Sequence, residues 1–182
     1  MQMNLPNKLT ILRVIMIPVF VVFLLCNNIP YNNLIAVVIF ALACITDALD
    51  GHIARKNNLV SNFGKFMDPL ADKLLVCSAL LCFVALKQIP VWIAIIIVSR
   101  EFIISGFRLI ASDNGVVIAA SKWGKLKTIA QMVMSILLIV NFNNTFFNVL
   151  EQIFIYLSLV LTVISLVDYI VKNLGVLNEG SK

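Results

Sequence analysis

The sequence predicts an all-α integral membrane protein with six transmembrane helices, and three observations support this fold class. Of the 182 residues, 61% are hydrophobic and 13% are charged, whereas soluble domains average roughly 25% charged residues. The stretches 14–46 and 128–150 carry no charge, and each is longer than the roughly 20 residues that one crossing needs. Clusters of Asn and Pro interrupt the apolar stretches and predict turns between helices.

These turn signals divide the chain into a short N-terminal interfacial segment, residues 1–10, and six spans. The first span is expected to begin near residue 9 and the second near residue 33, and the others cover residues 65–86, 90–111, 123–140 and 146–171. A polar connection is expected over residues 112–127. We expect one membrane domain over residues 1–172 and a polar tail over residues 173–182.

The distribution of basic residues predicts the orientation of the chain. If the N-terminus is cytoplasmic, all of the 14 lysines and arginines except Lys87 fall at or near the cytoplasmic side, as the positive-inside rule requires. We therefore expect a multi-pass protein of the inner or plasma membrane with both termini in the cytoplasm. The net charge of +5 fits contact with membrane lipids and phosphates, and the absence of basic aromatic motifs argues against nucleic acid as a partner.

Four aspartates lie in the stretch 47–72, in two pairs with helical spacing. Asp47 and Asp50 are three residues apart, and Asp68 and Asp72 are four apart, so each pair shares one face of a helix. Asn and Gly residues between the pairs allow the chain to turn back. We therefore expect two antiparallel helices that bring both pairs into one pocket facing the cytoplasm.

Four clustered carboxylates repel one another unless cations lie between them. Oxygen ligands favour Mg²⁺ or Mn²⁺ over Zn²⁺, and two such ions can stabilise both sides of a phosphoryl displacement. Gly51 leaves room for a ligand beside the backbone, and Arg55 can bind a phosphate through two hydrogen bonds. The alternative, solvated charges at helix ends, is disfavoured by the repeated spacing and the apolar surroundings.

The stretch resembles the signature of the CDP-alcohol phosphatidyltransferases. The pattern is Asp-x-x-Asp-Gly-x-x-Ala-Arg, then eight residues, then Gly-x-x-x-Asp-x-x-x-Asp, and it is filled by Asp47, Asp50, Gly51, Ala54, Arg55, Gly64, Asp68 and Asp72. The resemblance implies a six-helix membrane enzyme, usually a homodimer, that transfers a phosphatidyl or similar group from a CDP-linked lipid to an alcohol and releases CMP. It also implies that the four aspartates bind the metal ions, two Mg²⁺ or Mn²⁺, and that Asp72 is the general base. We assign Gly51, Arg55 and Ser61 to the CDP-lipid site.

The N-terminal residues Asn7, Thr10 and Arg13 recur every three positions. They are either a helix cap, a neutral residue and a positive-inside anchor, or groups that reach the nucleotide diphosphate. Family members with Pro-Asn-x-x-Thr-x-x-Arg at this place are similar, which implies a role in binding the CDP-lipid.

Two groups of basic residues lie in the second half of the chain. Arg100 and Arg108 are eight residues apart and share nearly one helix face, which forms either an anion site or a pair of membrane anchors, and Glu101 can pair with one of them. Basic residues at a helix start oppose the helix dipole, so we expect a lipid headgroup or a substrate phosphate beside the second group: Lys122, Lys125 and Lys127.

Residues 67–73, 100–102 and 124–128 resemble the family members that make phosphatidylglycerophosphate. The resemblance implies transfer of the phosphatidyl group from CDP-diacylglycerol to glycerol 3-phosphate, in anionic phospholipid biosynthesis, with the basic residues holding the acceptor phosphate. One alternative is another acceptor within the family, for the synthesis of cardiolipin, phosphatidylinositol phosphate or phosphatidylserine. The other is a divalent-cation transporter, which one-sided carboxylates disfavour because a transport site is reached from both sides.

Overall fold

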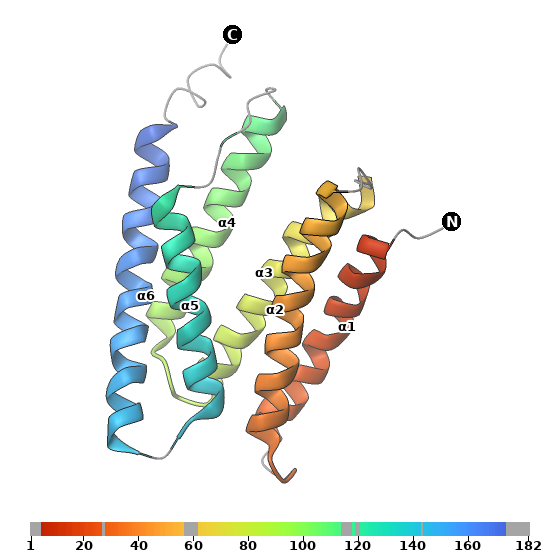
Figure 1. Cartoon of the computed structure of the whole chain (residues 1–182). Helices are drawn as coiled ribbons and strands as arrows, with labels where there is room; N and C mark the ends of the chain where they lie inside the picture. Colours follow the sequence, from red (N-terminus) through yellow and green to blue (C-terminus); the bar gives the residue numbers. More distant parts are fainter. Residues whose placement is uncertain are drawn as a thin grey trace. The chain divides into compact units, whose positions relative to one another are not determined.

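The computed structural model of the chain is all-helical over the residues that it describes, which are 5–26, 28–56, 62–113, 118, 121–142 and 144–173. In these ranges there are six α-helices and no strand, which confirms the predicted all-α class. The helices form two compact units, Met1–Gln88 and Ile89–Lys182. Figure 1 shows the three helices of each unit with their labels.

Unit 1 contains α1 (Leu5–Leu25), α2 (Asn32–Lys56) and α3 (Asn62–Ala85). Helix α1 packs against both α2 and α3. The rings of Phe20 and Phe40 meet at 5.6 Å between α1 and α2, and both side chains are buried. Small buried residues on α2, Ala36 and Ala43, allow the helix backbones to approach closely, as is common between membrane helices.

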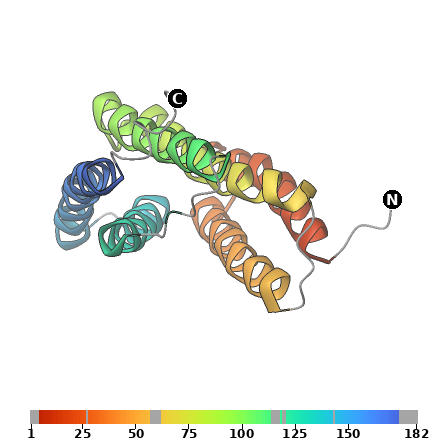
Figure 2. The same ribbon diagram turned by 90° about the horizontal axis from the view of Figure 1, so that it is seen from above.

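Unit 2 contains α4 (Val91–Asp113), α5 (Lys122–Val140) and α6 (Thr145–Lys172). Helix α6 packs against both α5 and α4, and α5 and α6 lie side by side in both views (Figures 1 and 2). The buried face of α6 carries three fully buried hydroxyl residues, Ser158, Thr162 and Ser165. Their small side chains keep the helices close, and two of the hydroxyls donate to backbone carbonyls one turn earlier.

Local capping explains where α5 and α6 begin and end. The Ser121 hydroxyl accepts a hydrogen bond from the Gly124 amide at the start of α5, and Asn144 accepts one from the Phe146 amide at the start of α6. Between the two helices, Asn141 adopts a left-handed conformation with φ 49°, which asparagine tolerates better than most residues. The turn predicted from the Asn-rich cluster is therefore confirmed.

The expected spans agree with the observed helices and differ from them at some of their ends, for example at α3, which begins at Asn62, and at α4, which ends at Asp113. Helix α1 begins at Leu5, so the later part of the expected interfacial segment belongs to the helix. Helix α5 begins at Lys122, so the connection before it is shorter than expected and the lysines lie inside the helix. Within the part of the chain that the structure describes, three helices are long and apolar enough to cross a membrane: Asn7–Leu25, Lys122–Val140 and Thr145–Lys172.

Candidate active site

The predicted carboxylate pairs occupy one end of unit 1. Asp47 and Asp50 lie on α2, Asp68 and Asp72 lie on α3, and the two helices run in opposite directions (Figure 1). The end of α2, the start of α3 and the start of α1 are therefore neighbours. Outside the part that the structure describes lie the side chains of Asp50, Arg55 and Asp68, the surroundings of Gly51, and all of Ser61.

Asp47 and Asp72 are the two carboxylates whose side chains the structure describes. The Asp47 side chain is 42% exposed, and Asp72 is also exposed, although Ala71 and Leu75 beside it are buried. The thiol of Cys44, one turn before Asp47, interacts electrostatically with both carboxylates. The structure therefore brings one carboxylate of each predicted pair into the same neighbourhood, open to ligands.

Arg13 on α1 forms an ion pair with Asp47. Its Nη1 atom lies 2.7 Å from Asp47 Oδ1, and the arginine side chain is fully buried. A membrane-surface anchor would place this guanidinium at the lipid headgroups, whereas it is enclosed by the helices of unit 1. Asn7 and Thr10, at the two preceding positions of the same spacing, are also buried. The three residues thus belong to the interior of the carboxylate end.

The donor chemistry at this end fits a hard divalent cation. Aspartate oxygens are the ligands that Mg²⁺ and Mn²⁺ prefer, and the exposure of Asp47 and Asp72 leaves their oxygens accessible. Among the described side chains no group of three or more His, Cys, Asp and Glu residues could hold a metal ion. Two of the four predicted ligands, Asp50 and Asp68, are not among those side chains.

Arg100 is the centre of the polar groups in unit 2. Its side chain is buried in α4, and its Nε atom donates to Ser165 Oγ of α6 at 3.1 Å. Its Nη1 atom donates to Glu101 Oε1 at 3.4 Å. On α5, a Cβ at Gly124 would lie 3.5 Å from Arg100 Nη2, so the first turn of α5 comes close to the guanidinium. Residues of α4 and α6 therefore hold this side chain by hydrogen bonds, and the first turn of α5 lies beside it.

Glu101 joins Arg100 to a lysine of α5. The Nζ atom of Lys127 donates to Glu101 Oε1, and the lysine side chain is only 3% exposed. Arg108 lies two turns after Arg100 and interacts with it electrostatically. We call Arg100, Arg108 and Lys127 the cation cluster. Glu101 compensates part of its positive charge.

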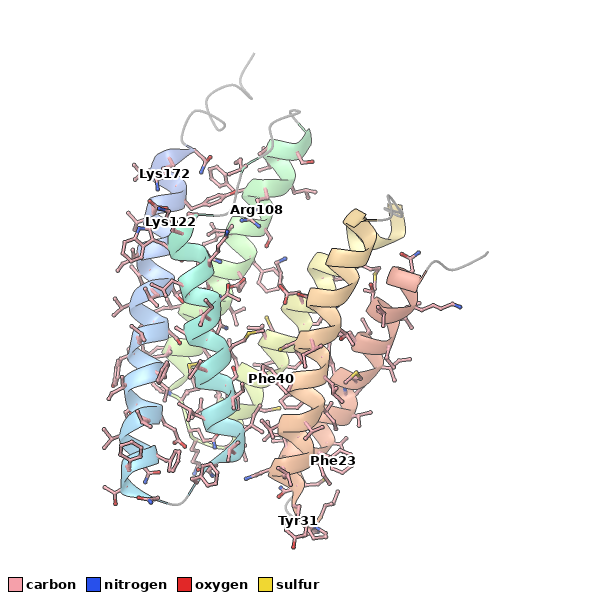
Figure 3. The ribbon with its side chains drawn as sticks, viewed as in Figure 1. Phe23, Tyr31, Phe40, Arg108, Lys122 and Lys172 are labelled. Atoms are coloured by element: carbon pink, nitrogen blue, oxygen red, sulfur yellow. The ribbon has the colours of Figure 1, made fainter. Side chains whose placement is uncertain are left out.

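Arg108 is exposed and lies over the ring of Tyr169, with Cζ 5.7 Å from the ring centroid. Phe107 packs its ring edge-on against the same tyrosine at 5.9 Å. Lys122 and Lys125 are exposed in the first turn of α5. Arg108 and Lys122 occur at the same end of unit 2 (Figure 3). The structure therefore joins Arg100 and Lys127 through Glu101, with Arg108 two turns further along α4 and the two exposed lysines in the first turn of α5.

Two residues that contact the cation cluster, Ser165 and Tyr169, were not identified from the sequence. They are four residues apart on α6 and so share one face, together with the buried Ser158 and Thr162. From the sequence alone this series is typical of residues that pack between helices, because serine and threonine are common between membrane helices. A search for polar residues at helical spacing near the charged end of α6 could have found them.

Comparison with known proteins places the chain in a family. The sequence model of the CDP-alcohol phosphatidyltransferases matches residues 3–164. A Bacillus subtilis protein named CDP-diacylglycerol–glycerol-3-phosphate 3-phosphatidyltransferase is 41% identical, with 93% of this chain and 95% of that protein covered. A Haemophilus influenzae protein of the same name is 41% identical, with 93% of each covered. A probable phosphatidylglycerophosphate synthase of Mycobacterium tuberculosis is 39% identical, with 94% of this chain and 82% of the relative covered.

The chain belongs to the CDP-alcohol phosphatidyltransferase family. It is a transferase of phospholipid biosynthesis with the helix composition of a membrane protein. The family generally depends on divalent metal ions, in agreement with the carboxylate chemistry of unit 1. The resemblance inferred from the aspartate signature is therefore confirmed.

Proposed function

We propose that this chain transfers the phosphatidyl group from CDP-diacylglycerol to glycerol 3-phosphate, giving phosphatidylglycerophosphate and CMP. The observation that carries the choice of acceptor is the cation cluster, in which Glu101 pairs with Arg100 and Lys127, and Arg108 lies two turns from Arg100 on α4. A phosphomonoester dianion needs several cations, whereas an uncharged acceptor such as inositol does not. The names of the relatives support the same acceptor.

The proposed donor site is the carboxylate end of unit 1. Asp47, Asp50, Asp68 and Asp72 are the proposed ligands of two divalent ions, Mg²⁺ or Mn²⁺, which when bound neutralise the diphosphate of the CDP-lipid. The acceptor hydroxyl attacks the phosphorus that carries diacylglycerol, the bond from that phosphorus to the bridging oxygen breaks, and CMP leaves. Asp72 takes the hydroxyl proton, and its exposure makes this carboxylate reachable by a substrate.

Within this site Arg13 has a positioning role that its ion pair supports. The buried guanidinium fixes Asp47, so that the carboxylate oxygen not held by Arg13 can serve a metal ion. Gly51, Arg55 and Ser61 are proposed to contact the CDP-lipid. A direct contact of Asn7 and Thr10 with the nucleotide stays a prediction.

The acceptor phosphate is proposed to bind at the cation cluster, with Lys122 and Lys125 at its edge. Arginine offers paired N–H donors that match phosphate oxygens. Arg100 is already oriented by Ser165, and Arg108 is exposed and therefore accessible to a ligand. The amino-terminal turn of α5 adds the positive end of a helix dipole to the same region.

Kinetics with both substrates test this assignment. Arg108→Ala and Lys125→Ala should each raise the KM for glycerol 3-phosphate about tenfold to a hundredfold, because a hydrogen bond to a charged group contributes roughly 1.5–3 kcal/mol. The KM for CDP-diacylglycerol should change little. Arg55→Ala should show the opposite bias. Lys87→Asn removes a cation from a position with φ 59° that asparagine tolerates, and serves as the charge control.

Two results would contradict the proposal. If the purified enzyme prefers inositol, serine or phosphatidylglycerol to glycerol 3-phosphate, the acceptor is wrong. If Arg108→Ala and Lys125→Ala reduce the amount of inserted protein and leave both KM values unchanged, these residues are membrane anchors. CMP release with a panel of acceptors distinguishes the cases.

We propose further that all six helices span the membrane, with both termini and the carboxylates on the cytoplasmic side. The helices have between 19 and 28 residues, near or above the roughly 20 needed for a crossing, and Lys87 is the one basic residue expected outside. The homodimer implied by the resemblance is part of the proposal. Cysteine labelling from each side tests the orientation, and native mass spectrometry tests the dimer.

A further inference from the structure

We propose that Tyr169 is a further acceptor-binding residue, whose ring supports Arg108 and whose hydroxyl donates a hydrogen bond to the phosphate of the acceptor. The inference rests on the proposed function, because it concerns the same acceptor phosphate. It assigns a role to a residue of α6 that neither the aspartate signature nor the basic residues indicate.

The hydroxyl of Tyr169 is buried without a hydrogen-bond partner. The residue is 3% exposed, and in the part of the chain that the structure describes its Oη atom meets no donor or acceptor. A buried polar group without a partner is costly, so such groups are rare in proteins and call for an explanation. A ligand that accepts a hydrogen bond would provide one.

The surroundings of the hydroxyl select an anion as that ligand. Arg108 lies over the tyrosine ring, and Arg100 donates a hydrogen bond to Ser165, one turn before Tyr169 on the same helix. Two guanidinium groups that can attract an anion therefore lie beside this part of α6. A phosphate has several acceptor oxygens, so it can accept from the arginines and from the hydroxyl together.

The ring and the hydroxyl have separable roles. The ring faces the Arg108 guanidinium and is fixed by the edge-on contact with Phe107, so it limits where the arginine can point. The hydroxyl makes no hydrogen bond with any of the described residues. Tyr169→Phe thus removes the proposed phosphate contact and leaves the support of Arg108 in place.

The test compares Tyr169→Phe with Tyr156→Phe in the full-length protein. Tyr156 lies on the same helix and is 52% exposed, so it is a matched control. Initial rates are measured with glycerol 3-phosphate and with glycerol, which lacks the phosphate. We expect Tyr169→Phe to lower the ratio of kcat/KM for glycerol 3-phosphate to that for glycerol about tenfold or more, through a raised KM for glycerol 3-phosphate. Tyr156→Phe should leave the ratio unchanged.

Thermal unfolding separates a binding role from a structural one. Because removing an unsatisfied buried hydroxyl costs the fold nothing, the unfolding midpoint of Tyr169→Phe should equal or exceed that of the wild type. An unchanged kcat/KM ratio, or a lowered midpoint, would overturn the inference. If Arg108→Ala raises the KM for glycerol 3-phosphate while Tyr169→Phe does not, this inference fails and the proposed function stands. If the wild type does not use glycerol 3-phosphate, the proposed function itself fails.

Discussion

The ion pair between Glu101 and Lys127 allows a quantitative prediction about the stability of unit 2. Lys127 is 3% exposed and Glu101 is 16% exposed, so the pair is nearly removed from water. Breaking a buried pair by neutralising one partner costs about 3–5 kcal/mol, because the other charge stays buried. Since Glu101 keeps some contact with water, we take the lower end, about 3 kcal/mol, for Glu101→Gln.

The two partners are not equivalent. Glu101→Gln removes the negative charge that serves both Lys127 and Arg100, whereas Lys127→Met leaves Glu101 with Arg100 at 3.4 Å. Lys127→Met should therefore cost less than Glu101→Gln. The double variant should be more stable than the sum of the single effects predicts, by about 0.5–3 kcal/mol, as residues in direct contact usually show.

Thermal unfolding in detergent, followed by tryptophan fluorescence, measures these effects. Both tryptophans of the chain, Trp92 and Trp123, lie in unit 2. At about 2–4 °C per kcal/mol for a chain of this size, Glu101→Gln should lower the midpoint by about 6–12 °C. Glu151→Gln is the control, because Glu151 is buried in the same unit and one of its oxygens has no hydrogen-bond partner among the described residues.

Two results would refute the predicted contribution of the ion pair between Glu101 and Lys127. If Glu101→Gln lowers the midpoint no more than Glu151→Gln does, the pair contributes nothing measurable to stability. If the two single effects simply add in the double variant, Glu101 and Lys127 do not interact in the way that the structure shows. Either result would also argue against a role for Glu101 in holding Arg100 and Lys127 in place.

Three further predictions concern unit 1. Exhaustive chelation of divalent metal should abolish CMP release and added Mg²⁺ or Mn²⁺ should restore it, because the aspartates need cations between them; full turnover after chelation would exclude the metal role. Asp72→Asn should abolish transfer and leave CDP-lipid binding measurable by titration, because the amide keeps the shape of the carboxylate and loses its charge and basicity; near-normal turnover would assign the base to another group. Arg13→Ala should lower kcat and weaken Mg²⁺ binding, measured by calorimetry, more than Arg13→Lys does, since a lysine retains the charge opposite Asp47; equal effects would show that charge at this position is irrelevant.

The all-α class and the positions of the six helices could be predicted from the sequence, because long apolar helices depend on a few strong signals. Charge-free stretches and Asn-rich turns located the helices, and the turn at Asn141 appeared where the Asn cluster predicted it. The ends were less certain. Helix α1 begins at Leu5, and its polar residues Asn7, Thr10 and Arg13 are buried in unit 1, whereas the polarity of this stretch suggested a surface segment.

The candidate site was predictable where chemistry demands fixed spacing, and less so where it depends on packing. The four aspartates follow a signature, so the sequence located them on two helices. The ion pair of Arg13 with Asp47 joins two helices, and no local pattern specifies which residues face each other across such a contact. The same holds for Ser165 and Tyr169, whose roles depend on how α6 is rotated against α4.

The two predicted substrate-binding regions have a common arrangement of charge. In unit 1, Arg13 is a buried cation paired with a proposed metal ligand, Asp47. In unit 2, Glu101 is a largely buried carboxylate paired with two proposed phosphate-binding cations. Each has the charge opposite to that of the residues around it, so each would weaken ligand binding if it acted only through its charge.

Beyond the stability that each ion pair contributes, the value of Arg13 and Glu101 for ligand binding therefore lies in geometry. A carboxylate held by Arg13 keeps one orientation before a metal ion arrives, and cations held by Glu101 do not swing apart under their mutual repulsion. Preorganised charges bind a ligand without first losing the conformational freedom of long side chains. On this view Arg13 and Glu101 are positioning residues, and their substitution should harm the precise alignment needed for transfer more than the attraction of the substrates.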